Sequence, residues 1–214
     1  MLLRIVLLSL TLCAYSVYAA DSDKAEGVGA SPKTAAALAT LLADTQSMQA
    51  KFSQRVVSDE GELLEESRGS MAFQRPNQLR WEIIEPYRYL VLTNGETLWR
   101  YDPDFEQLST ESFRSVAQTP MLILAASAAE LDGQYLIEAK TVEGEQQFDL
   151  KPRSKDAEFT RLVLAFTGKL LSEMQLTDKL GQETTIALTE TRLNRKKLAD
   201  KLFEFDSAGA GSEQ

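Results

Sequence analysis

The sequence predicts a mainly β protein with a small α-helical part, built on one large antiparallel sheet. Short apolar segments alternate with turn signals such as Asp59-Glu60-Gly61, Glu143-Gly144 and Leu180-Gly181 over most of the chain. Within these segments apolar and polar residues alternate, as they do in strands that bury one face. The connections between segments are short, which favours hairpins between antiparallel strands.

The amino-terminal residues read as an export signal. Arg4 gives a positive start, Ile5 to Val17 is largely apolar, and Val17-Tyr18-Ala19 offers small residues at the positions that a signal peptidase requires. We therefore expect residues 1–19 to be a cleaved signal peptide and 20–214 to form one domain. Leu10-Thr11-Leu12 before Cys13 is a poor lipidation signal, so an outer-membrane acceptor anchored through Cys13 is a less favoured alternative.

Composition excludes several classes of function. The 214 residues include 23 basic and 32 acidic side chains, a net charge of −9, which argues against a nucleic-acid partner. The chain contains no histidine, and this excludes Ser-His and Cys-His catalysis as well as zinc sites built on imidazole. We expect no catalytic residue, no metal and no cofactor.

A helix and then a strand are predicted at the start of the domain. Ser31-Pro32 resembles a helix start, and Leu38, Leu41, Leu42 and Thr45 form one apolar stripe. The period changes to two near Met48. Further short strands between turn signals are predicted at residues 135–139, 147–150, 162–166, 174–177 and 184–188. Asn94-Gly95 predicts a tight primed turn between strands 89–93 and 97–101.

One predicted strand ends in a charged residue that lies on the apolar face of the strand. Because side chains alternate, Met71, Phe73 and Arg75 share one face, while Ser70, Ala72 and Gln74 share the other. A guanidinium directed at an apolar space must find acceptors, since an unpaired charge there costs several kcal/mol, roughly. Arg75 therefore either holds parts of the structure together or has a role in function.

Apolar side chains exceed what an ordinary sheet needs. Thr119-Pro120 starts a short helix over 121–126 that is apolar on nearly every side, and it either plugs the core or forms a lid. For any single aromatic residue of this region, a place in an ordinary sheet core is the better interpretation. Taken together with this helix, however, the aromatic residues predict a ligand cavity. These aromatic residues are Phe52, Phe73, Trp81, Tyr87, Tyr89, Trp99, Tyr101 and Phe105.

Carboxylates give a weaker signal for catalysis or divalent-cation binding. Such residues are usually solvated or form turns in a chain this acidic, and Asp102 and Asp104 flank a proline. An exported carboxylate-dependent hydrolase is thus a minor alternative. The residues concerned are Glu82, Glu85, Asp102, Asp104 and Glu106.

Several motifs in order resemble the LolA family of periplasmic lipoprotein carriers. They are Ala50-Lys51-Phe52-Ser53-Gln54, Gln74-Arg75-Pro76-Asn77, Leu79-Arg80-Trp81, Glu85-Pro86, Asn94-Gly95-Glu96-Thr97-Leu98-Trp99 and Tyr101-Asp102-Pro103. The resemblance implies an incomplete, half-open antiparallel β-barrel with helices covering its concave face as a lid. It also implies a monomeric periplasmic chaperone that takes lipoproteins by their acyl chains from an inner-membrane LolCDE-like transporter to a LolB-like outer-membrane acceptor. A carrier or sensor of free lipid or glycolipid on the same scaffold is the alternative.

The resemblance also assigns site residues. Arg75 matches the family's arginine that latches the lid, and Leu79 stands at the rim used for meeting the transporter, where an aromatic residue is common. The expected lid and cavity residues are Phe52, Met71, Phe73, Trp81, Val91, Trp99, Met121, Leu122 and Leu124.

Overall fold

The computed structural model describes residues 27–28, 32–113, 123–124, 127–193 and 197–206. The expected signal peptide, Met121 and Leu122, and the start of the expected lid helix at Thr119-Pro120 lie outside the described residues. Within them, Ile123 and Leu124 form a short 3-10 turn.

One antiparallel sheet of 12 strands forms the protein in the described residues, with the order β1-β8-β9-β10-β11-β12-β2-β3-β4-β5-β6-β7. The strands in chain order are β1 (Gly27–Val28), β2 (Ser47–Val57), β3 (Leu63–Gln74), β4 (Gln78–Glu85), β5 (Tyr89–Thr93), β6 (Thr97–Asp102), β7 (Gln107–Ser112), β8 (Tyr135–Val142), β9 (Glu145–Pro152), β10 (Phe159–Thr167), β11 (Leu170–Asp178) and β12 (Glu183–Leu193). The edges β1 and β7 are not paired with each other, so the sheet stays open. The predicted mainly β, half-open fold is confirmed.

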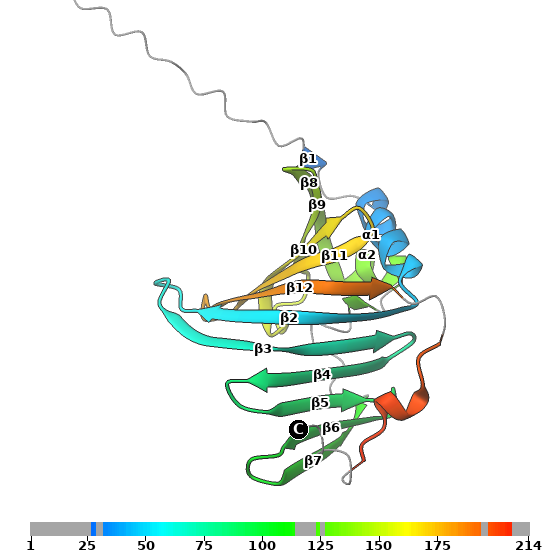
Figure 1. Ribbon diagram of the computed structural model, residues 1–214. Coiled ribbons are helices and arrows are strands. Elements are labelled where there is room, and N and C mark those ends of the chain that lie inside the picture. Colours follow the sequence, from blue (N-terminus) through cyan, green and yellow to red (C-terminus); the bar gives the residue numbers. More distant parts are fainter. Residues whose placement is uncertain (1–26, 29–31, 114–122, 125–126, 194–196, 207–214) are drawn as a thin grey trace, which may run out of the picture.

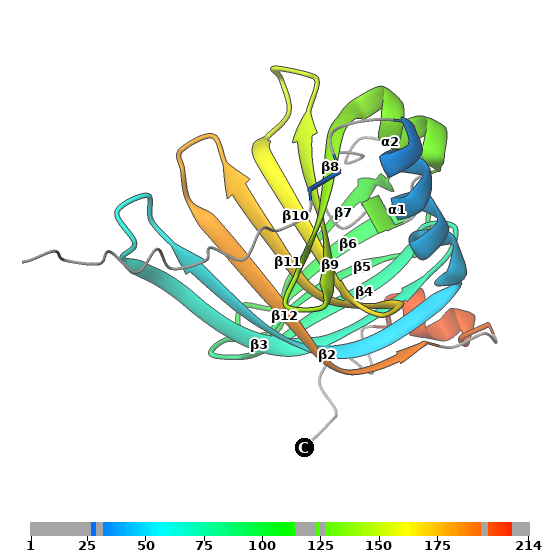
Figure 2. The same cartoon turned by 90° about the horizontal axis from the view of Figure 1, so that it is seen from above.

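The sheet curves, and two helices lie on its concave side (Figures 1 and 2). Helix α1 (Pro32–Asp44) begins at the proline that the sequence indicated, and its Leu38 and Leu42 are buried. Helix α2 (Ala128–Gln134) packs against α1. One apolar core fills the space between these helices and the concave face. It contains Met48 and Ala50 of β2, which alternate with outward-facing polar residues as expected.

Helix α2 was not predicted, although its start carries a sequence signal. The Ser127 hydroxyl accepts from the main-chain N–H of Glu130, and the Glu130 carboxylate accepts from the N–H of Ser127. This reciprocal capping box satisfies two N–H groups that a helix start leaves without partners. A Ser-x-x-Glu spacing before an apolar residue would have indicated this helix.

A short segment near the carboxyl terminus packs on the convex face. The 3-10 helix η3 (Asp200–Phe203) contacts β4 and lies across the ends of β4 to β6 (Figure 1). Phe203 and Leu92 are fully buried there, outside the concave core. Part of the convex face is thus buried as well, around Leu92, whereas we expected burial on one face only.

The hairpin between β5 and β6 forms as expected, but its turn is longer than a two-residue primed turn. Thr93 pairs with Leu98, and of the Asn94-Gly95 pair only Gly95 has a positive φ, of 96°. The Asn94 side chain instead accepts hydrogen bonds from the N–H groups of Glu96 and Thr97, at 3.0 and 2.9 Å. An Asx-type turn therefore replaces the primed turn.

Candidate functional site

The Arg75 guanidinium joins the end of β3 to two segments on the concave side. Nε donates to the carbonyl oxygen of Thr45 at 3.2 Å, and Nη2 donates to that of Leu42 at 2.9 Å. Nη2 also donates to the carbonyl oxygen of Leu124 at 2.6 Å. The side chain thus holds together the carboxyl end of α1, the turn after it, and the 123–124 segment.

Two features of the local structure place Arg75 there. Its main-chain N–H donates to the carbonyl of Gln46 at 3.0 Å, which fixes the strand end beside the end of α1. The last carbonyls of a helix have no partners within it and carry the negative end of its dipole, so they attract a cation. Burial lowers the pKa of Arg75, but an arginine keeps its charge at any physiological pH.

Aromatic rings form the centre of the apolar interior. Phe52 of β2 stacks on Trp81 of β4, with ring centroids 3.7 Å apart and planes inclined by 19°. Gly69 on the strand between them makes this possible. A Cβ on Gly69 would lie 1.9 Å from the carbonyl oxygen of Glu82 and 2.7 Å from Cζ of Phe52. Any side chain at position 69 would therefore displace either the ring or the β4 backbone.

The other interior residues surround this stack. Met71 and Phe73 are each 3% exposed, and Val91 packs against the same core from β5. Ile123 and Leu124 are buried in that core as well, so the 123–124 segment contributes side chains to the interior while its main chain bonds to Arg75. Among the described residues, side chains of the sheet, of α1 and of the 123–124 segment pack together in this core.

Trp99 does not lie in this interior, and grouping it with Trp81 was wrong. It pairs with Leu92, which in turn pairs with Arg80, so these three side chains point to the convex face. Trp81 pairs with Val91, on the concave face. The neighbouring Tyr101 is also convex and packs edge-on against Phe205, with ring centroids 5.2 Å apart.

Other aromatic residues from the sequence grouping also lie elsewhere. Tyr87 and Phe105 are 75% and 74% exposed, in loops between strands. The aromatic residues of that grouping are therefore spread over several places, and apolar side chains from α1 and from β8 to β12 complete the interior, among them Phe148, Phe159 and Phe166.

Leu79 is not an exposed rim residue. It is 6% exposed and belongs to the core, because it faces inward between Phe73 of β3 and Thr93 of β5. A partner meeting this end of the sheet in this conformation would therefore contact the β3–β4 turn before it reached Leu79.

Sequence reasoning missed a buried hydroxyl on the concave face. Ser67 is 3% exposed and shares the face of Met71 and Phe73, since the pairing of β2 with β3 is regular from Ser67 to Gln74. Among the residues that the structure describes, its Oγ has no hydrogen-bond partner. A buried polar atom of this kind is uncommon.

The candidate carboxylates do not converge. Asp102 Oδ1 accepts from the N–H groups of Asp104 and Phe105 and so shapes a turn, and Glu82 pairs with Arg80. The described residues contain no cluster of three or more acidic or cysteine side chains that could hold a metal ion. Within that part of the chain, no helix is long and apolar enough to cross a membrane.

An open antiparallel sheet with helices over an apolar concave face defines a half-barrel protein with an interior suited to apolar groups. The family model for the outer membrane lipoprotein carrier protein LolA matches residues 43–206. The chain belongs to this LolA family, as the sequence resemblance indicated.

Curated relatives agree with this assignment, and a solved structure agrees with the fold. The outer-membrane lipoprotein carrier protein of Chromohalobacter salexigens is 37% identical over 73% of this chain and 75% of its own length. That of Azotobacter vinelandii is 34% identical over 91% of this chain and 89% of its own. The fold also matches an uncharacterized conserved protein from Thermus thermophilus, with a TM-score of 0.50 and 15% identity, over 80% of this chain and 95% of that one.

Proposed function

We propose that this protein is a periplasmic chaperone without catalytic activity, which binds the acyl chains of lipoproteins released from the inner membrane and delivers them to an outer-membrane acceptor. Family membership and the names of the relatives support a lipoprotein cargo. The observation that carries the mechanism is the set of Arg75 hydrogen bonds to α1, its following turn and the 123–124 segment, above an apolar interior.

Energetics favour an enclosed interior over a surface patch. An acyl chain of about 15 methylenes loses roughly 12 kcal/mol when it is exposed to water, at about 0.8 kcal/mol per CH₂. A carrier must bury most of each chain and must still release it. Since Leu124 is buried in the core, entry of a chain has to displace covering residues such as this one.

The hydrogen bonds of Arg75 contribute to the balance between binding and release of an acyl chain. Each hydrogen bond from a charged donor contributes about 1.5 to 3 kcal/mol, so three of them favour the closed form by several kcal/mol, roughly. When cargo opens the interior these bonds break, and their reformation on closing assists release. Arg75 is therefore the latch of the lid, with Phe52, Met71, Phe73, Trp81, Val91 and Leu124 as the surface that the acyl chains meet.

The proposed transport of lipoproteins also requires a donor and an acceptor protein. The donor is an inner-membrane transporter of the LolCDE type and the acceptor an outer-membrane protein of the LolB type, by analogy with the family. The carrier works as a monomer in the periplasm, where the expected signal peptide directs it.

The experiment that tests the latch is the substitution Arg75→Leu. We expect the variant to load lipoprotein in a spheroplast release assay and to transfer it to the acceptor at least about tenfold more slowly, because closing no longer regains the lost hydrogen bonds. Arg80→Leu, on the opposite face of the neighbouring strand, is the matched control. Transfer by Arg75→Leu at the normal rate would contradict the latch role of Arg75. Failure of both the wild type and the control to load lipoprotein would contradict the carrier function itself.

A further inference from the structure

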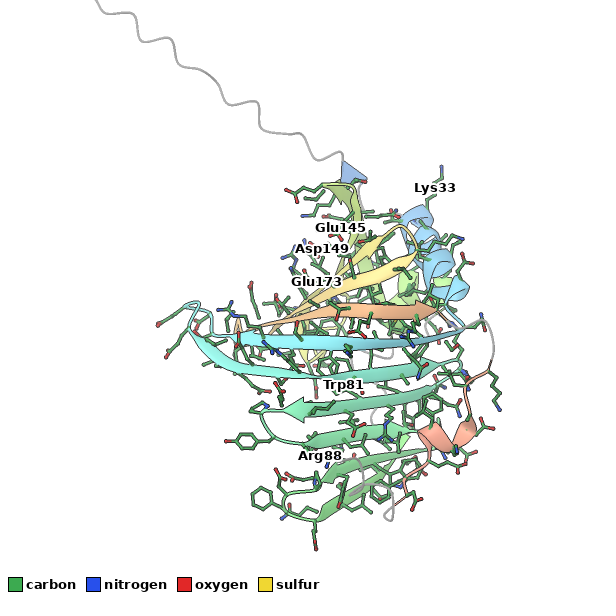
Figure 3. The ribbon with its side chains drawn as sticks, viewed as in Figure 1. Lys33, Trp81, Arg88, Glu145, Asp149 and Glu173 are labelled. Atoms are coloured by element: carbon green, nitrogen blue, oxygen red, sulfur yellow. The ribbon has the colours of Figure 1, made fainter. Side chains whose placement is uncertain are left out.

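A polar hollow of about 830 Å³ lies on the convex face, on the other side of the sheet from the apolar interior. Its floor is formed by β2 to β5 and the end of β12, and one wall is the segment that contains η3. Figure 3 shows Arg88 on this side of the sheet, in front of β5 and β6. The charged residues that line the hollow are Lys51, Arg80, Glu82, Arg88, Glu190, Arg192 and Lys201.

The charge of this hollow is opposite to that of the chain. Five cations and two carboxylates line it, a net charge of +3, whereas the whole chain carries −9. The cations come from separate parts of the sequence, which the fold brings around one recess. Charges of one sign in a recess focus the field and attract counter-ions, while the acidic remainder of the surface repels anions.

The ion pairs inside the hollow leave cations in excess. Lys51 Nζ lies 2.7 Å from a carboxylate oxygen of Glu190. Arg80 Nε and Nη2 both donate to Oε2 of Glu82, at 3.1 and 2.9 Å. Arg88 reaches only 4.0 Å from the other oxygen of that carboxylate.

Two further cations line the hollow without such a partner. Within the described part of the chain, Arg192 and Lys201 have neither an ion pair nor a side-chain hydrogen bond, and both are exposed. Because Arg88 shares the Glu82 carboxylate with Arg80, the hollow keeps an excess of three positive charges.

The wall of the hollow is firmly attached. The N–H of Leu198 donates to Oε1 of Gln74 at 2.5 Å, Phe203 is fully buried, and Phe205 packs on Tyr101. Leu90, Tyr101, Pro103 and Leu202 add apolar surface to the lining. The recess is thus preformed, and it offers both cationic and apolar contacts.

We propose that this hollow binds a phosphate-bearing anion, either the headgroup of an acidic phospholipid or a free phosphate ester. Three unbalanced cations suit a phosphate, which has up to two negative charges and several acceptor oxygens, better than a single carboxylate. Guanidinium groups match phosphate oxygens in pairs. The volume exceeds that of phosphate alone and is typical of a site for an organic ligand, so the apolar wall contacts the substituent on the phosphate.

The test measures binding of defined anions to the full-length protein after export. Calorimetry with glycerol phosphate and with inorganic phosphate tests the free source, and flotation with phosphatidylglycerol or phosphatidylcholine vesicles tests the headgroup source. Saturable binding of glycerol phosphate assigns a free phosphate ester. Flotation that requires phosphatidylglycerol and is lost at high salt assigns the headgroup, and either result supports the site.

Charge reversal locates the site. The double variant Arg192→Glu with Lys201→Glu should raise the dissociation constant of the anion at least about tenfold. This factor corresponds to the loss of one charge-assisted hydrogen bond or more. Lys151→Glu with Lys155→Glu changes the net charge equally at exposed positions elsewhere, and binding should stay within about twofold of wild type. Arg192→Gln with Lys201→Gln is a milder second variant should the reversal misfold.

Two results would overturn the proposal. One is the absence of binding by either anion source, and the other is an equal loss of binding in both double reversals, which would mean diffuse attraction only. Loading of an acyl probe into the interior should be the same in both double variants, so the outcome here is independent of the carrier function.

Discussion

Ser67 shows how one residue departs from the apolar pattern of the interior. Its hydroxyl is buried on the concave face and has no hydrogen-bond partner in the described part of the chain, and desolvating an unpaired hydroxyl costs about 1 to 3 kcal/mol. Ser67→Ala should therefore raise the free energy of unfolding by about 1 kcal/mol in urea titrations. Ser70→Ala, three residues along the same strand and on the convex face, should change it little.

A loss of stability in Ser67→Ala would mean that the hydroxyl has a partner in solution, such as a bound water. Such a result would also place a polar group in the part of the interior that acyl chains must occupy. Arg75 differs from Ser67 in this respect, because its polar atoms have acceptors on the covering segments.

Among the elements, α2 depends on its cap more than on its length. It has only seven residues, too few to be stable alone, and Leu131 is its single buried residue. Ser127→Ala removes the half of the capping box that the hydroxyl makes, although the main-chain N–H at position 127 can still donate to Glu130, and should cost about 1 kcal/mol. Hydrogen exchange of the amides in α2 should speed up, while that of amides in β2 and β3 stays as in the wild type.

The same cap gives α2 a pH dependence. Hydrogen bonds from Ser127 lower the pKa of the Glu130 carboxyl, so the folded state favours its charged form. The resulting stabilisation is present above the ordinary pKa of a glutamate and is lost as the pH falls through the lowered value. Relative to the intrinsic exchange rate at each pH, acid should therefore lower the protection of the α2 amides in the wild type, and should lower it less in Ser127→Ala. An equal acid response in both proteins would contradict a role for this cap.

Elements with a strong period were predictable, and those held by distant contacts were not. Alternation at Met48 and Phe52 gave β2 and its buried face, because side chains in a strand have a fixed period. The capping signal at Ser127 was present but overlooked. η3 carries no periodic signal, and it is buried because Leu198 and Phe203 meet the convex face of strands more than 100 residues earlier.

Trp99 was misplaced for a different reason. Even a two-residue turn at Asn94-Gly95 would pair Trp99 with Leu90, so Trp99 could not share a face with Val91. Grouping aromatic residues by closeness in sequence ignored this parity. Arg75 was placed on the correct face by the same rule, but its acceptors on α1 and the 123–124 segment could not be read from the sequence, because they depend on how the helices pack.

At the scale of the whole molecule the sheet separates two environments, and the two tryptophans report on them separately. Trp81 lies in the apolar interior and Trp99 faces the convex side. With Trp99→Phe, an acyl chain brominated along its length should quench most of the emission from Trp81, because bromine quenches only at close range. With Trp81→Phe, the same ligand should leave the emission of Trp99 nearly unchanged.

The unbrominated chain controls for changes in conformation, and competition between the two ligands confirms a shared site. Equal quenching of both tryptophans would place acyl chains on the convex face or at several sites, contrary to a single interior site. Glycerol phosphate should not compete with the brominated chain, because the sheet lies between the hollow and the interior. Competition between them would instead mean that the two faces are coupled, and would connect binding on the convex face to opening of the concave one.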